Sequence, residues 1–144
     1  MPHHLLLIED DETAAYVTQR RLIHCGFTMD LHVVSDGKEA LDYLACAGRY
    51  TGRQTGNPAL IVLDLKLPDV DGFEVLKYIR SAPALFDIPV FILSASRTEE
   101  DIYRSTLLGI SKYLVKPLAM SEFTPAVDKV LNPGAGDATE SPRR

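Results

Sequence analysis

The chain has 144 residues, of which 46% are hydrophobic and 24% are charged, and its formal net charge is −5. A chain of this length forms one ordinary domain and can bury a core without metals or disulfides. The acidic excess and the scattered lysines and arginines argue against direct DNA or RNA binding, which needs clustered basic residues.

The amino-terminal residues MPHHLLLIEDD lack the basic and long apolar regions of a signal peptide. No apolar run approaches the roughly 20 residues of a membrane-spanning helix. Cys25 and Cys46 fit neither a metal-binding nor a redox spacing, and we expect buried or half-buried thiols. His3 and His4 have no third ligand nearby, so we expect solvated imidazoles. Together these features predict a cytoplasmic protein that has no contact with a membrane.

Five short apolar runs alternate with five helix-like segments along the chain. The apolar runs, each predicted to be a strand, cover residues 5–8, 31–34, 60–63, 88–93 and 113–115. The predicted helices begin near residues 13, 36, 71, 98 and 121, and those whose ends we place finish near 24, 47 and 131. Asp36 and Asp71 each have a glutamate three residues later, a pattern typical of a capping box at a helix start.

Two segments differ from this alternation. Residues 48–58 carry three glycines and a proline, and we predict a surface loop. Residues 133–144, PGAGDATESPRR, are rich in Pro, Gly and small polar residues, so we predict a disordered tail after a domain that covers residues 1–132.

The predicted strands indicate an α/β fold with one parallel sheet. The runs at 60–63, 88–93 and 113–115 are apolar on both faces, which is typical of strands covered by helices on both sides. Sheets of this kind bind their ligands beyond the carboxyl ends of the strands. The residues that follow each strand are therefore the candidates for a functional site.

Polar groups follow four of the five strands. They are Glu9-Asp10-Asp11, Asp64, Ser94 and Lys116-Pro117. Acidic residues from two strands would repel each other alone, but together they offer the oxygen ligands that Mg²⁺ prefers. A lysine and a hydroxyl nearby complete what phosphoryl transfer needs, namely cations to neutralise charge and a carboxylate oxygen to attack.

Each of these signals also has a plainer interpretation. Asp11 precedes a helix and could serve only as its N-cap, and we leave both roles open for this residue. Lys116-Pro117 could be part of an ordinary turn, and Ser94 could be a loop hydroxyl. Four such groups at four strand ends, in order, favour a shared site.

The segments LLLIEDD, LIVLDLKLPDVDGFEVL, VFILSAS and YLVKPL resemble the receiver domains of two-component response regulators. The resemblance extends from about Leu5 to Leu131. Within that family the chain is most similar to single-domain regulators paired with phytochrome-type histidine kinases, because it has the Gly-rich insertion before residue 60 and the stretch SAPALFDIPVFILSASRTEEDI. The resemblance implies a flavodoxin-like, doubly wound (βα)5 fold around a five-stranded parallel sheet.

The resemblance also implies a role for each strand-end residue. Asp64 would accept a phosphoryl group from a phosphohistidine of the kinase. Mg²⁺ or Mn²⁺ would be held by Asp10, Asp64, the backbone carbonyl of Lys66 and, through water, Glu9. Lys116, in a cis bond to Pro117, would pair with the phosphoryl oxygens, Ser94 would hydrogen-bond the phosphorylated form, and Tyr113 would be the switch aromatic.

This resemblance predicts a signalling domain rather than an enzyme. We expect its partners to be a sensor histidine kinase, with a bacterial phytochrome as the candidate, and a second copy of the chain in a homodimer. Lys66 departs from the family pattern, which often has a neutral or acidic group there; it could alter the phosphoryl lifetime or be only a solvated side chain.

Three other functions remain as alternatives. An aspartyl-phosphate phosphatase would need an acid two residues after Asp64, where this chain has Lys66. A nucleotide-binding or flavodoxin-like module would need a Gly-rich or hydroxyl-rich loop after the first strand, where this chain has Glu9-Asp10-Asp11. A degenerate receiver that acts only as a docking module would not need the complete set of acids, hydroxyl and lysine.

Overall fold

The computed structural model describes residues 4–132, so the predicted tail at 133–144 lies outside the described residues. The sheet contains five parallel strands in the order β2-β1-β3-β4-β5. The strands are β1 (His4–Ile8), β2 (Asp30–Val34), β3 (Leu60–Leu63), β4 (Val90–Ser94) and β5 (Lys112–Val115). The helices are α1 (Glu12–His24), α2 (Gly37–Ala45), η1 (Gly48–Tyr50), α3 (Gly72–Ser81), α4 (Glu99–Leu108) and α5 (Met120–Leu131).

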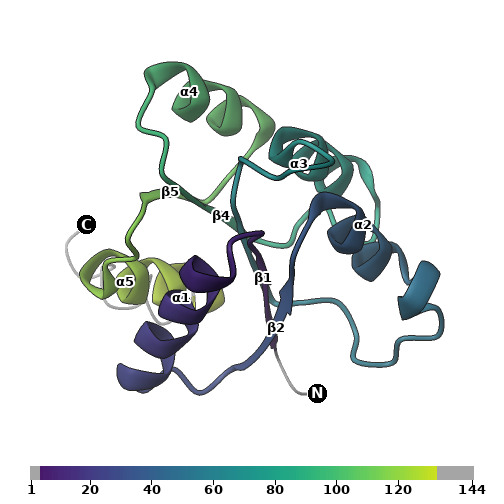
Figure 1. The fold of residues 1–144 in the computed structure, drawn as a ribbon, viewed down its shortest axis with the longest axis horizontal. Helices are drawn as coiled ribbons and strands as arrows, with labels where there is room; N and C mark the ends of the chain where they lie inside the picture. Colours follow the sequence, from purple (N-terminus) through teal and green to yellow (C-terminus); the bar gives the residue numbers. More distant parts are fainter. Residues whose placement is uncertain (1–3, 133–144) are drawn as a thin grey trace, which may run out of the picture.

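Helices cover both faces of the sheet, so the predicted doubly wound α/β fold is confirmed (Figure 1). Helices α1 and α5 pack on one face and α2 and α3 on the other, with α4 beside α3. Alternate residues of β1 point to opposite faces: Leu5 and Leu7 join the α1/α5 core, while Leu6 and Ile8 join the α2/α3 core. Every residue of β1, β3 and β4 is buried, as expected for central strands with helices on both sides.

Three helix starts carry the side-chain caps that the sequence indicates, but of the two expected capping boxes only that of Asp36 and Glu39 forms among the described residues, because Glu74 pairs with Lys77 at 3.2 Å instead. Asp36 accepts a hydrogen bond from the backbone N–H of Glu39 at 2.7 Å, and Glu39 reaches back to the N–H of Ser35 at 2.9 Å. Asp71 caps α3 by accepting from the N–H of Phe73, and Thr98 caps α4 by accepting from the N–H of Asp101. These side chains satisfy N–H groups that have no partner inside the helix.

Several boundaries differ from the prediction. Strand β4 begins at Val90 rather than 88, because Pro89 has no N–H to donate to the sheet. Helix α2 ends at Ala45, where Cys46 takes the left-handed conformation at φ 55°, and the predicted loop contains the short helix η1. Predictions about three single residues are wrong: Cys25 and Cys46 are exposed, and His4 is buried rather than solvated, while His3 lies outside the described residues.

Among residues 4–132, every helix falls short of the length and apolar character needed to cross a membrane. The parallel register brings the carboxyl ends of β1, β3, β4 and β5 to one edge. Backbone hydrogen bonds continue this register past the strands, since the N–H of Asp64 donates to Ile8 at 3.0 Å and that of Lys116 to Ser94 at 2.8 Å. The residues after the strands are thereby held close together.

Candidate functional site

Lys116 lies at the centre of the polar groups at this edge of the sheet. Its ammonium nitrogen is 2.6 Å from Oε1 of Glu9 and 2.9 Å from Oδ2 of Asp64. Both acids are almost completely buried, Glu9 with 3% and Asp64 with 5% of its surface exposed. A buried carboxylate requires a positive or hydrogen-bonding partner, and Lys116 is that partner for both.

A third carboxylate, that of Asp10, lies beside these two. Oxygen atoms of Glu9, Asp10 and Asp64 lie within 4.8 Å of one another, and Asp10 is exposed to solvent. The cluster therefore carries more negative than positive charge. Because the donors are all hard oxygen ligands and one side of the site is open to water, the residues fit a hexacoordinate Mg²⁺ or Mn²⁺ that keeps some of its water.

The charges of the site shift the pKa of two of its members. Burial raises the pKa of Glu9 to about 6, and the nearby charge of Asp64 adds to this, while the hydrogen bond from Lys116 opposes it. Burial alone would lower the pKa of Lys116, but its hydrogen bonds to Glu9 and Asp64 outweigh burial and raise it. Lys116 is therefore a permanent cation at neutral pH, and an added cation would favour the ionised form of Glu9.

The second oxygen of Asp64 contacts the loop that follows it. Oδ1 accepts a hydrogen bond from the backbone N–H of Lys66 at 3.2 Å, while the Lys66 side chain is exposed. The Asp64 carboxylate is thus oriented by Lys116 on one side and by the backbone of this loop on the other.

Ser94 and Tyr113 lie beside the charged cluster, on neighbouring strands. Ser94 is fully buried at the end of β4, and its Oγ accepts a hydrogen bond from the N–H of Ser96 at 3.2 Å. The half-buried Tyr113 donates from its hydroxyl to the carbonyl of Ser96 at 3.0 Å, and burial raises its pKa. The loop after β4 therefore connects the hydroxyl of Ser94 to the aromatic ring on β5.

Two further strand-end residues have clear structural roles. Asp11 is the N-cap of α1 and accepts from the N–H of Thr13 at 3.1 Å, which settles its capping role. The Lys116–Pro117 peptide bond is cis, as the resemblance predicts.

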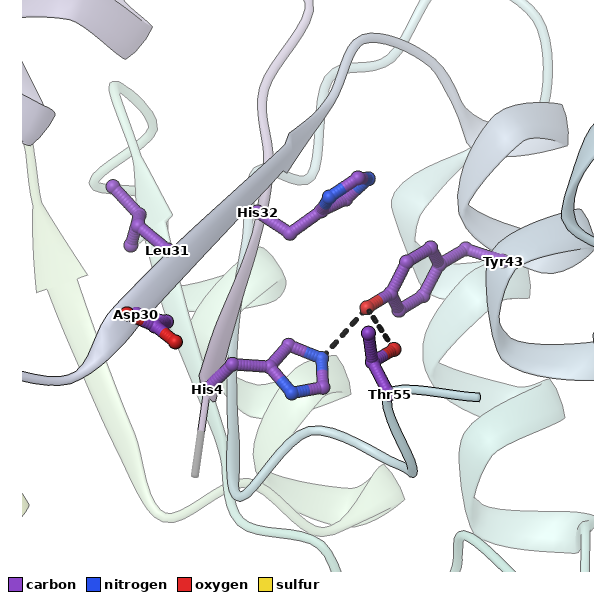
Figure 2. Close-up of a pocket in the computed structure, with 6 residues that line it drawn as sticks. All are labelled: His4, Asp30, Leu31, His32, Tyr43 and Thr55. Carbon is purple, nitrogen blue, oxygen red and sulfur yellow. Dashed lines mark hydrogen bonds between the residues drawn. The ribbon is translucent and has the colours of Figure 1, made fainter. Parts of the chain in front are cut away.

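A second group of polar side chains lies where α2 packs against β1 and β2, and no pattern in the sequence marks it (Figure 2). The Tyr43 hydroxyl lies 2.7 Å from Nε2 of His4 and 3.4 Å from Oγ1 of Thr55. His32 stacks on the Tyr43 ring with centroids 4.6 Å apart, and its Nε2 lies 3.2 Å from the hydroxyl of Tyr50. A cavity of about 360 Å³ lies beside these side chains. It is lined by His4, Asp30, Leu31, His32, Tyr43 and Thr55. We call His4, His32, Tyr43 and Tyr50 the histidine–tyrosine cluster.

Sequence reasoning also missed the role of Asp69. Its carboxylate accepts hydrogen bonds from the backbone N–H groups of Gly37 and Lys38 at 2.8 and 2.9 Å, across more than 30 residues of sequence. These backbone hydrogen bonds outweigh the opposing effect of desolvation and lower the pKa of Asp69. The pair Pro68-Asp69 is typical of a turn, and only the tertiary structure shows that Asp69 bonds the start of α2.

The response regulator receiver domain family matches residues 5–128. The chain belongs to this family. Its relatives include the probable methanogenesis regulatory protein FilR2 of Methanothrix harundinacea, which is 36% identical over 129 residues, or 90% of this chain and 81% of FilR2. The chain spans about half the length of some transcriptional regulators that it also matches, such as SphR of Synechococcus elongatus (52%) and CusR of Escherichia coli (55%).

The receiver is also similar to response regulators of phytochromes. The bacteriophytochrome response regulator AtBRR is 40% identical, with a TM-score of 0.82 over 90% of this chain and 93% of AtBRR. The Mn²⁺-bound form of Rcp1 is 33% identical with a TM-score of 0.76 over 89% of this chain and 93% of Rcp1. The phosphorylated cyanobacterial phytochrome response regulator RcpA is 34% identical with a TM-score of 0.77 over 92% of this chain and 96% of RcpA.

Proposed function

We propose that this two-component receiver takes a phosphoryl group on Asp64 from the phosphohistidine of a sensor histidine kinase. The observation that carries the proposal is the position of Asp64, buried at the end of β3, bonded to Lys116 at 2.9 Å and grouped with Glu9 and Asp10. The phosphorylated structure of the similar protein RcpA supports it.

In the proposed reaction a carboxylate oxygen of Asp64 attacks the phosphorus atom. The new P–O bond forms as the P–N bond to the imidazole breaks, and the imidazole nitrogen keeps the electron pair and takes a proton from solvent. Lys116 already bonds the attacking carboxylate, and its ammonium neutralises charge that develops on the phosphoryl oxygens.

Mg²⁺ or Mn²⁺ would be held beside the phosphoryl group by Asp10, Asp64, the backbone carbonyl of Lys66 and, through water, Glu9. A bound divalent ion screens the repulsion between the carboxylate and the phosphoryl oxygens. The three clustered carboxylates, and the Mn²⁺-bound form of the similar protein Rcp1, support this assignment.

Ser94 and Tyr113 transmit the change in the proposed switch. The phosphoryl group on Asp64 adds strong acceptor oxygens that attract the hydroxyl of Ser94. That movement alters the loop whose Ser96 carbonyl accepts the Tyr113 hydroxyl at 3.0 Å. The charge change at Asp64 then biases the position of Tyr113 and the adjoining face of α4.

The output is contact with other proteins rather than catalysis or direct DNA binding. A phytochrome-type kinase is the proposed phosphoryl donor, because AtBRR and RcpA are regulators of that kind by name. A homodimer through α4 is the proposed assembly, since Tyr103 and Leu107 are 65% and 68% exposed on that helix. The cytoplasm is the proposed location, where the receiver would meet the kinase domain that carries the phosphohistidine.

The test is intact mass spectrometry after incubation with acetyl phosphate, with and without Mg²⁺, on the native chain and the Asp64→Asn variant. The proposal predicts a Mg²⁺-dependent gain of one phosphoryl group on the native chain and none on the variant. No gain from acetyl phosphate or from a phosphorylated kinase would overturn it and favour a degenerate receiver that only docks.

A further inference from the structure

The loop between β3 and α3 is the part of the site that the sheet does not hold directly. Residues 65–71 connect Asp64 to the first turn of α3, and Lys66, whose carbonyl is a proposed metal ligand, lies within them. The base of this loop is closed by the N–H of Gly72, which donates to the carbonyl of Leu65 at 3.1 Å. A Cβ atom at Gly72 would lie 2.6 Å from the backbone of Asp64 and Leu65, so the base is as tight as a backbone allows.

Asp69 fixes the outer part of this loop to helix α2. Each oxygen of its carboxylate accepts one N–H from the first two residues of α2, Gly37 and Lys38. Charge-assisted hydrogen bonds of this kind are stronger than neutral ones, and the positive end of the helix dipole adds to them. Asp69 thus caps α2 from a different part of the chain.

The helix that Asp69 contacts is a firm support. Asp36 and Glu39 cap the same end of α2 independently, and Ala40 on its inner side is fully buried. The backbone of the loop touches this end directly, because a Cβ atom at Gly37 would lie 2.5 Å from the carbonyl oxygen of Val70. The loop is therefore held at its base by Gly72 and at its far side by α2.

We propose that Asp69 is a positioning residue for the divalent cation: by fixing the loop to α2 it sets the place of the Lys66 carbonyl beside Asp64. This inference rests on the proposed function, because it assigns a task within the same site. Asp69 itself is exposed and points to α2, so it acts through the backbone of the loop and does not touch the ion or the phosphoryl group. Groups that orient metal ligands in this way affect metal affinity strongly.

A purely structural role of Asp69 can be distinguished from a positioning role by removing another cap of α2. If Asp69 only stabilised α2, removing any cap of that helix end would have the same consequence. Asp36 provides the matched control: it caps the same helix with a 2.7 Å hydrogen bond to the N–H of Glu39, and no hydrogen bond joins it to residues 65–71 among the described residues.

The experiment measures Mn²⁺ affinity by electron paramagnetic resonance, and the rate of phosphorylation by acetyl phosphate as a function of Mg²⁺ concentration. Asp69→Ala and Asp36→Ala are compared with the native chain, and urea unfolding confirms that each variant is folded. For Asp69→Ala the proposal predicts about tenfold weaker Mn²⁺ binding and a similar rise in the Mg²⁺ concentration for half-maximal rate, with the rate at saturating Mg²⁺ within about twofold of native. Asp36→Ala should lose stability and keep its native metal affinity.

Equal metal affinity in Asp69→Ala and the native chain, or equal losses in both variants, would overturn the positioning role. Failure of the native chain to bind Mn²⁺ or to accept a phosphoryl group would instead contradict the proposed function itself. The two failures are therefore distinguishable.

Discussion

The strand-end site and the histidine–tyrosine cluster both place polar side chains against the sheet, and they differ in charge balance. In the cluster each hydroxyl and imidazole that we describe has a hydrogen-bond partner, as in the pair Tyr43–His4 at 2.7 Å, and the Tyr50 hydroxyl also donates to the carboxylate of Glu39 at 2.6 Å. In the site three carboxylates lie together, and a single ammonium bonds two of them, Glu9 and Asp64. The cluster is complete as it stands and stabilises the fold, whereas the site holds excess negative charge that costs stability and suits a cation.

This difference predicts that substitutions have opposite consequences in the two regions. In the cluster they should lower stability and leave phosphorylation intact. In the site, replacing a carboxylate should abolish or slow phosphorylation and cost little stability, because it relieves excess negative charge, whereas replacing Lys116 should also cost stability.

The largest effect on stability is expected from Tyr43→Ala. Tyr43 is 2% exposed and contacts His4 and His32 as well as Arg53, whose guanidinium lies 4.1 Å from the ring centroid. Loss of a buried aromatic ring should lower the free energy of unfolding by about 3–5 kcal/mol in urea titrations. Tyr43→Phe keeps the ring and leaves His4 without its partner, so about 1–2 kcal/mol should be lost. If either folded variant failed to accept a phosphoryl group, the cluster would belong to the functional machinery.

The largest effect on phosphorylation short of removing Asp64 is expected from Lys116→Ala. Removal of this ammonium takes away the cation that bonds both Glu9 and Asp64. The rate of phosphorylation by acetyl phosphate should fall by about 10²–10³-fold, the loss typical of one donor to a developing charge. Lys38→Ala, which removes an exposed ion pair with Asp42, is the control and should keep the native rate. A native rate in Lys116→Ala would contradict the role assigned to the site.

The two regions should also respond to pH with opposite sign. Burial lowers the pKa of His4 and of His32 below 6.5, so the unfolded chain binds protons more readily, and their contribution to stability is lost as pH falls below 6.5. Burial raises the pKa of Glu9 from 4.5 to about 6, so the folded chain binds a proton first and gains stability, on the order of 1–2 kcal/mol, as pH falls from above 6 to 4.5.

Urea titrations between pH 7.5 and 4.5 measure these slopes. His4→Gln should reduce the loss of stability at acid pH, while Glu9→Gln should remove the opposing gain and make the acid loss steeper. If both variants changed the dependence of stability on pH in the same direction, the two regions would not respond to pH with opposite sign.

The smallest expected effect concerns Lys66. Its exposed side chain follows Asp64 by two residues and can lie over the path of an attacking water molecule. Lys66→Asn should shorten the lifetime of the phosphorylated chain by up to about fivefold, since an exposed charge contributes about 1 kcal/mol or less. Dephosphorylation timed beside Lys77→Asn, on the outer face of α3, provides the control; equal lifetimes for Lys66→Asn and the native chain would leave Lys66 a solvated side chain.

The sequence was sufficient for the fold and for the residues gathered at the strand ends. Apolar runs and capping residues such as Asp36 and Asp71 are local signals, and the rule that parallel strands align their carboxyl ends brings Asp64 and Lys116 together across 52 residues. The doubly wound topology was implied by the resemblance to receiver domains, and the apolar runs by themselves indicated only a parallel sheet with helices on both sides.

The histidine–tyrosine cluster and Asp69 could not be predicted, because their partners depend on tertiary packing. His4 pairs with Tyr43 across 39 residues, and Asp69 with Gly37 across 32, without a periodic pattern that marks either contact. His4 looked solvated because its neighbour in sequence is another histidine, whereas its burial comes from β2, α2 and the segment around Thr55. Polar residues that complete a core show no periodic pattern in the sequence that identifies them.

We propose that the charged cluster supports phosphorylation of Asp64. Locating the phosphoryl group on the chain tests this directly. The chain is treated with acetyl phosphate and Mg²⁺, reduced with borohydride, which converts an aspartyl phosphate into homoserine, and digested for tandem mass spectrometry. The account predicts homoserine at position 64 and at no other aspartate, and none when Mg²⁺ is withheld. Homoserine at another position, or a phosphoryl mass gain with an unmodified Asp64, would contradict it.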